Sequence, residues 1–183
     1  MPNENLKKLY VDELKDLFSA ESQLLKALPK MAKAASSDEL RTGFEKHLEQ
    51  TRGHVQRLEE IFESLNENPK GKKCVGMQGL VEEGSEVMEE GFEDAVLDAG
   101  LIGAARRVEH YEMAAYSAVS EFAKVLGQAK HASLLEKTLA EETQTDEKLA
   151  ELAKAINSQA NEEGFEERQD PSLSGKKTQR RAA

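Results

Sequence analysis

Apolar residues recur every three or four positions through most of the chain, which is the spacing of one buried face of an α-helix. In the N-terminal segment this face runs through Tyr10, Leu14, Leu17, Leu24 and Leu28. The same periodicity predicts four long helices, at about residues 5–35, 38–65, 94–126 and 132–158. The linker between the first two is short, so we expect them to pack antiparallel.

The connection between the second and third long helices is much longer than an ordinary turn in a helix bundle. The run from Asn66 to Gly71 contains two Asn, a Pro and a Gly and ends the second helix, and a shorter helix is expected at about 77–90. A connection of this length can cross the bundle and leave the second and third helices parallel. We therefore predict an all-α, ferritin-like four-helix bundle with a long crossover that carries a short extra helix.

The apolar periodicity is lost from Gln159 onward, and the chain ends in polar and basic residues. Segments of this composition cannot bury enough apolar surface to fold. We predict a bundle over residues 1–158 and a disordered, polar and basic tail over 159–183.

Several acidic residues occupy positions where the apolar pattern calls for Leu or Val. Glu21 stands on the apolar face of the first helix, Glu112 on that of the third, and Glu109 lies one turn before Glu112. The fourth helix carries Glu142 and Asp146 one turn apart. A carboxylate facing a core is costly unless it is paired, protonated or bound to a metal.

Acidic residues from four helices that face a shared interior are typical of dinuclear carboxylate metal sites. In the second helix Glu49 lies beside the apolar face, which we placed through Phe44, Leu48, Thr51 and Val55. The predicted metal ligands are Glu21, Glu49, Glu109, Glu112, Glu142 and Asp146. An oxygen-rich set suits iron or manganese, so we predict two iron ions, with manganese as the alternative.

The histidines fit the usual bundle pattern less well. That pattern places a His three residues after a Glu in two of the helices. Arg52 follows Glu49 by three, and Thr145 follows Glu142 by three. His47 and His54 are close to Glu49 in sequence, but we expect them to face a different side, on the surface or outside the ligand sphere.

The formal net charge of −10 argues against a nucleic-acid-binding protein, which would present a basic face. Cys74 is the single cysteine, so an intrachain disulfide is excluded, and we expect it to be a small buried apolar residue.

Neither a membrane-spanning apolar run nor an N-terminal signal peptide is recognisable, so we expect a cytoplasmic protein. Long amphipathic helices often pair through an apolar strip, and we expect a homodimer.

Five short motifs resemble the YciE/YciF-type ferritin-like family, and in order they cover about residues 6–157. They are the runs 16–21 (DLFSAE), 47–51 (HLEQT), 73–80 (KCVGMQGL), 108–112 (VEHYE) and 141–146 (EETQTD). The resemblance implies a rubrerythrin-like four-helix fold, a di-iron site, a bacterial stress setting and a ferroxidase-like activity. Some relatives carry a His three residues after the Glu of the second helix, where this chain has Arg52.

Two hypotheses of function follow. The first is a dinuclear iron or manganese protein that acts on O2 or peroxide, with ferrous oxidation as its favoured reaction. The second is a metal-free helical bundle that acts as a structural or interaction protein under stress. Metal content separates them.

Overall fold

The computed structural model describes residues 4–169, with side chains through residue 162, and this part of the chain forms five helices and no strand. The helices are α1 (Glu4–Ala34), α2 (Asp38–Leu65), α3 (Val75–Glu89), α4 (Asp94–Val125) and α5 (Ala129–Gln169). No helix among the described residues combines the length and the apolar character that crossing a membrane would require.

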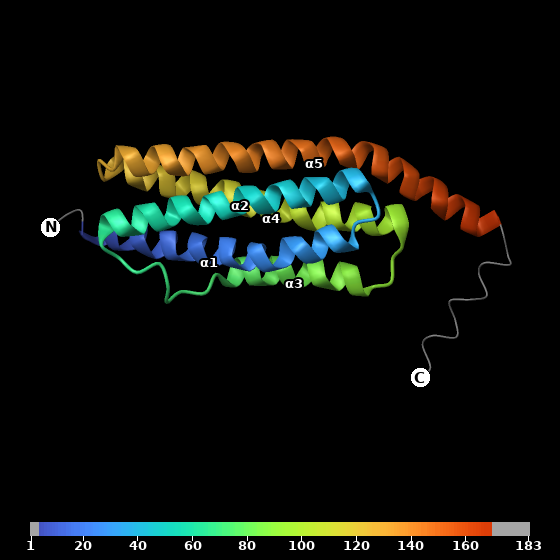
Figure 1. Ribbon diagram of the computed structural model, residues 1–183, viewed down its shortest axis with the longest axis horizontal. Helices are drawn as coiled ribbons and strands as arrows, with labels where there is room; N and C mark the ends of the chain where they lie inside the picture. The colour runs from blue at the N-terminus through green and yellow to red at the C-terminus, as the bar shows by residue number, and fades with distance from the viewer. Residues whose placement is uncertain (1–3, 170–183) are drawn as a thin grey trace.

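The four long helices form a bundle with one crossover, as predicted. Figure 1 shows α1 and α2 as an antiparallel pair, and α4 and α5 as a second one. The chain returns along the bundle between α2 and α4, so these two helices run in the same direction (Figure 1). The short helix α3 lies within this crossover and packs against α1 and α4. The predicted ferritin-like topology is confirmed.

The last helix is longer than the sequence indicated. We placed it at 132–158, whereas α5 runs Ala129–Gln169. The end of α5 extends past the other helices (Figure 1), so it has no partner helix to contact and needs no apolar face there. The loss of periodicity after Gln159 therefore marks where α5 leaves the bundle and not where it ends. Residues 170–183 lie outside the described residues, and the division of the chain at residue 158 stays a prediction.

Two turns hold the helix pairs together. At the start of α2, the hydroxyl of Ser37 accepts a hydrogen bond from the Leu40 amide at 3.3 Å. The buried carboxylate of Asp98, on α4, accepts the backbone N–H groups of Ser36 and Ser37 at 2.8 and 2.7 Å. After α4, Gly127 has a φ of 72°, a conformation that glycine adopts without steric cost. The contacts of Asp98 with the turn set the position of α4 along the α1–α2 pair.

The apolar core is divided into two clusters by a layer of polar side chains. On α1 the residue Leu17 belongs to one cluster and Leu24 to the other, with Glu21 between them. On α5 the residues Leu135 and Leu149 belong to the two clusters in the same way, with Glu142 between them. The polar layer lies inside the bundle, and all four long helices contribute to it.

Candidate metal centre

Six side chains from the four long helices meet in the polar layer. The bundle helices supply them as follows: Glu21 from α1, His47 and His54 from α2, Glu109 and Glu112 from α4, and Glu142 from α5. Each of these residues is at most 3% exposed to solvent. Carboxylate and imidazole groups are seldom buried this completely unless they are paired or bind a metal.

The six side chains form two groups that share one member. His47, Glu109, Glu112 and Glu142 form the first group, and Glu21, His54 and Glu142 form the second. Within each group, one potential ligand atom per residue lies within 4.8 Å of all the others. Because Glu142 belongs to both groups, its carboxylate lies between them, in the position of a bridging ligand of a dinuclear site.

The ligand atoms converge without satisfying one another. The His54 Nδ1 atom lies 2.9 Å from a Glu142 oxygen and 3.3 Å from a Glu21 oxygen, yet it makes no correctly aligned hydrogen bond. The His47 Nε2 atom lies 3.2 Å from Glu109 in the same manner. Both carboxylate oxygens of Glu112, and both of Glu142, are buried without a hydrogen-bond partner.

Buried polar atoms in folded proteins nearly always have a partner, so a cluster of unpaired ones requires an explanation. With the carboxylates ionised and the imidazoles neutral, these atoms would all carry lone pairs that point into a common space. Two divalent cations would use these lone pairs and would offset the negative charge of the carboxylates. The residues present therefore fit a dinuclear metal site.

The ring of His54 is oriented by neighbours outside the cluster. Its Nε2 atom lies 3.0 Å from the Glu141 carboxylate, and Arg57 donates to both oxygens of that carboxylate at 2.8 and 2.9 Å. Burial acts to raise the pKa of Glu141, but the hydrogen bonds and charge of Arg57 outweigh it and hold this pKa below its ordinary value. An ionised Glu141 accepts the Nε2–H proton, so that in a neutral, metal-bound His54 the Nδ1 lone pair would face the centre.

The ring of His47 is oriented by Thr145 of α5. The Thr145 hydroxyl donates to the Glu141 carbonyl at 3.0 Å, so its oxygen can accept the Nδ1–H of His47 at 3.5 Å. The Nε2 atom of His47 is then free to act as a ligand. Thr145 stands three residues after Glu142, where the usual bundle pattern has a His. In this chain His47, from α2, places an imidazole beside Thr145.

Burial and repulsion between carboxylates make the cluster a strong binder of protons when no metal is present. Burial, followed by the charges of neighbouring carboxylates, raises the pKa of Glu109 and of Glu112 well above the ordinary value. Burial lowers the pKa of His47 despite the nearby Glu142. Burial would also lower the pKa of His54, but Glu142 and Glu21 outweigh it and raise this pKa to about 10.

Two tyrosines of α4 lie in different surroundings. Tyr116 is fully buried, and its hydroxyl donates to a Glu21 oxygen at 2.5 Å. It therefore contacts a candidate ligand directly. Tyr111 donates to Asp16 at 2.8 Å and lies 2.9 Å from the Cys74 sulfur. Cys74 is buried, as expected.

The structure brings together four of the six predicted ligands, Glu21, Glu109, Glu112 and Glu142. The prediction that Glu49 faces the interior is wrong, because its side chain is 69% exposed and pairs with Arg52 on the surface of α2. Asp146 lies outside both groups. Arg106 of α4 binds its two oxygens at 2.8 and 3.2 Å, and this contact lowers the pKa of Asp146.

The expectation that His47 and His54 face away from the interior is also wrong. One signal in the sequence could have found them. The positions Leu40, Phe44, His47, Thr51, His54 and Leu58 alternate in steps of four and three, and every one of them is buried. This is a more regular apolar face than the one through Leu48 and Val55, which are only partly buried.

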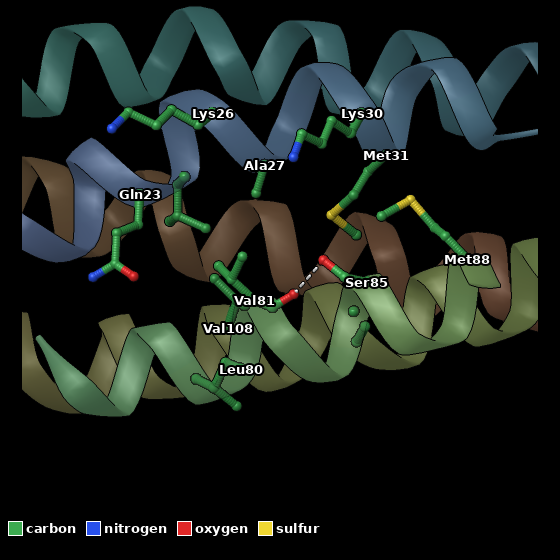
Figure 2. Close-up of a pocket in the computed structure, with 13 residues that line it drawn as sticks. Gln23, Lys26, Ala27, Lys30, Met31, Leu80, Val81, Ser85, Met88 and Val108 are labelled. Atoms are coloured by element: carbon green, nitrogen blue, oxygen red, sulfur yellow. Dashed lines mark hydrogen bonds between the residues drawn. The ribbon is translucent and has the colours of Figure 1, made fainter. Parts of the chain in front are cut away.

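Two cavities lie near the centre. One, of about 60 Å³, is lined by His47 and Glu109 as well as by apolar side chains. The other, of about 210 Å³, is a groove lined by residues of α1, α3 and α4 (Figure 2). None of the six candidate ligands lines this groove.

A four-helix bundle with one crossover and a buried cluster of Glu and His from all four helices defines the class of ferritin-like proteins. A family model described as "Domain of unknown function (DUF892)" matches residues 5–162. Protein YciF of Escherichia coli strain K12 is 44% identical over 154 residues, which cover 84% of this chain and 93% of YciF. The chain belongs to the DUF892 family, and the expected relationship to YciE/YciF-type proteins is confirmed.

Solved structures agree with this assignment. The crystal structure of the E. coli stress protein YciF matches with a TM-score of 0.82 and 43% identity, over 85% of this chain and 98% of that one. Ferritin-like, diiron-carboxylate proteins from Bacillus anthracis match with a TM-score of 0.64 at 20% identity, over 82% of this chain and 98% of that one. At that identity the second match shows the fold alone.

Proposed function

We propose that this protein holds two iron or manganese ions in the polar layer and uses them to react with O2 or hydrogen peroxide. The observation that carries the proposal is the set of buried ligand atoms on four Glu and two His that have no hydrogen-bond partner. One relative supports the setting, since YciF is described as a stress protein.

Charge balance favours two divalent ions over one. Four carboxylates meet in the layer, and two divalent cations would neutralise them while both imidazoles remain neutral. One ion would be held by His47, Glu109 and Glu112, the other by Glu21 and His54, with Glu142 shared. When bound, a pair of ferrous or manganous ions supplies two electrons, one from each metal, to an oxidant.

The rest of the layer holds this set in place. Tyr116 keeps its proton on the hydroxyl oxygen, because burial raises its pKa well above the ordinary value, and it donates that proton to Glu21. Glu141 and Thr145 fix which nitrogen of His54 and of His47 faces the centre. The two apolar clusters on either side exclude bulk water, which strengthens every electrostatic contact within the layer.

The alternative hypothesis, a metal-free structural or interaction protein, leaves the unpaired atoms of Glu112 and Glu142 unexplained. It also gives no reason for the orientation of His54 by the Glu141–Arg57 pair. The homodimer and the cytoplasmic location stay predictions.

Metal analysis of protein purified without chelators tests the proposal. We expect close to two equivalents of Fe or Mn per chain, or their uptake when the apo protein is reconstituted without oxygen. The loaded protein should then change its metal absorption spectrum on addition of hydrogen peroxide or O2. Less than about half an equivalent, with no uptake on reconstitution, would defeat the proposal in favour of the metal-free alternative.

A further inference from the structure

The cavity of about 60 Å³ connects the candidate metal centre with the surface. His47, Glu109 and Thr145 form its inner end. Its walls are mainly apolar, with Leu28, Phe44, Leu149 and Leu152, and include one amide side chain, that of Gln50. The exposed Lys46 and Lys148 line its outer end. A molecule the size of O2 or hydrogen peroxide could follow this cavity to the ligands of the first group.

The outer end of the cavity is positively charged, although the chain as a whole carries a formal charge of −10. Within the described part of the chain, neither Lys46 nor Lys148 has an ion-pair partner. Some other surface lysines are paired, and Lys124, for example, contacts both Glu121 and Glu136. Glu109, itself a candidate ligand, is the single acidic residue in the lining of the cavity.

A hydrated divalent cation is opposed at each step of such a route. Two ammonium groups repel it at the entrance, and the mainly apolar walls offer few oxygen atoms to replace its water. An uncharged oxidant meets neither obstacle. We propose that this cavity admits a small uncharged oxidant, hydrogen peroxide or O2, and that divalent cations reach the ligands by another path.

This inference rests on the proposed function and narrows it. A ferroxidase must admit a ferrous ion in every turnover, whereas an enzyme that breaks down hydrogen peroxide keeps its metal ions. One H2O2 then accepts two electrons and two protons to give two waters, and a second H2O2 returns them as it is oxidised to O2. A cavity that admits the oxidant and opposes cations fits the second arrangement, in which the metal ions stay bound and the oxidant is the substrate.

The larger groove is not the route. It touches none of the six ligands, and the side chains of Leu24, Met31 and Val108, which line both cavities, separate it from the smaller one. Figure 2 shows Ser85 facing the space between α1 and α3, where its hydroxyl donates to the Val81 carbonyl. The groove therefore offers a control site at which a large side chain should leave access to the metals unchanged.

Gly43 provides a way to block the cavity without disturbing the fold. It lines the cavity within α2, and a Cβ atom added there would meet no atom within 4 Å. Replacing glycine inside a helix also favours helix formation. The variant Gly43→Phe should fill the cavity, Gly43→Ala should leave it open, and Ser85→Phe is the matched control in the groove.

Two rates are measured for each variant. The first is the rate at which apo protein binds Co²⁺, followed by the absorption of the bound ion. The second is the bimolecular rate constant for oxidation of the metal-loaded protein by hydrogen peroxide, and by O2 in a parallel series. We expect Gly43→Phe to lower the rate constant for at least one oxidant by about tenfold or more and to change Co²⁺ binding less than about twofold. Gly43→Ala and Ser85→Phe should change neither rate.

Three results would overturn the inference. If Gly43→Phe slows Co²⁺ binding as much as oxidation, cations and oxidant share the cavity. If it slows neither oxidant, the oxidant enters elsewhere. If Ser85→Phe slows oxidation equally, the groove is the route. The proposed function fails separately, when wild-type protein binds no metal or when its loaded form reacts with neither oxidant.

Reversing the charge at the entrance tests the part played by the lysines. The double variant Lys46→Glu with Lys148→Glu should open the cavity to cations and raise the rate of Co²⁺ binding at low salt by about tenfold. The rate of reaction with the uncharged oxidant should change less than about twofold. An unchanged Co²⁺ rate, or a large fall in the peroxide rate, would contradict the proposed exclusion of cations.

Discussion

Replacing Glu112 by Leu tests two things separately: how much this buried carboxyl group destabilises the apo protein, and whether it is needed to bind metal. Glu112 is fully buried on α4, and neither of its oxygens has a hydrogen-bond partner. A buried polar group left unsatisfied costs about 1–3 kcal/mol of stability. Leu continues the apolar face of α4 at nearly the same size. We therefore expect the apo form of Glu112→Leu to be about 1–3 kcal/mol more stable than the apo wild type.

Urea unfolding of both proteins at neutral pH, in the presence of a chelator, measures this difference. With a denaturant dependence of about 2 kcal/mol per molar urea, a gain of about 2 kcal/mol moves the midpoint up by about 1 M. The matched control is Glu63→Leu, which changes an exposed Glu on α2 and should leave the midpoint in place. Added metal at a hundred times its dissociation constant should stabilise the wild type by about 2.7 kcal/mol, and Glu112→Leu far less.

The reasoning would be refuted if apo Glu112→Leu unfolded at lower urea than the wild type and still bound two metals. That result would place Glu112 in a stabilising contact and remove the main reason to see the polar layer as a metal site.

Three further predictions test parts of the site. In the folded apo protein the pKa values of Glu109 and Glu112 are raised above the ordinary value of 4.5. Their protonated forms therefore stabilise the fold below pH 4.5, and this stability is lost as the pH rises. The difference in unfolding free energy between apo Glu112→Leu and apo wild type should grow from pH 4.5 upward, and a constant difference would contradict this prediction. Glu141→Ala removes the acceptor that orients His54 and should weaken metal binding by about 10–100-fold in a titration, with unchanged affinity as the opposing result. Glu49→Gln and Asp146→Asn should leave the metal content at the wild-type value, and loss of one equivalent in either would restore that residue to the ligand set.

The fold could be predicted because the information that determines it is local. The three-and-four spacing of apolar residues defines each long helix, and the long segment between α2 and α4 defines the crossover. Glu21, Glu112 and Glu142 could be predicted as interior acids for the same reason, since each interrupts an otherwise apolar face with a charge.

The second helix was misjudged because two neighbouring faces of α2 both carry apolar residues. Successive residues are rotated by about 100° around a helix, so choosing Leu48 and Val55 as the centre turns Glu49 inward and the histidines aside. In the structure the face is centred on His47 and His54. Burying two histidines is favourable only because the carboxylates of α1, α4 and α5 lie beside them. The sequence of α2 alone does not show which residues of the other helices will be its neighbours.

Asp146 illustrates a second limit of prediction from sequence. It lies one turn after Glu142, but Arg106 of α4 reaches it and holds its carboxylate outside the cluster. The Arg106–Asp146 pair joins two helices far apart in sequence, so the pattern of residues within α5 does not predict it. The contact between His47 of α2 and Thr145 of α5 also joins two helices far apart in sequence, so it could not be predicted from the pattern of either helix.

Anomalous diffraction from crystals of the metal-loaded protein tests the central claim most directly. Data collected at the iron and manganese absorption edges locate each metal and identify it. The account predicts two peaks per chain, about 3.5–4 Å apart, one beside His47, Glu109 and Glu112, the other beside Glu21 and His54, with Glu142 between them. A loaded crystal with no peak in the polar layer, or with its metal bound at Asp146 or Glu49 instead, would contradict it.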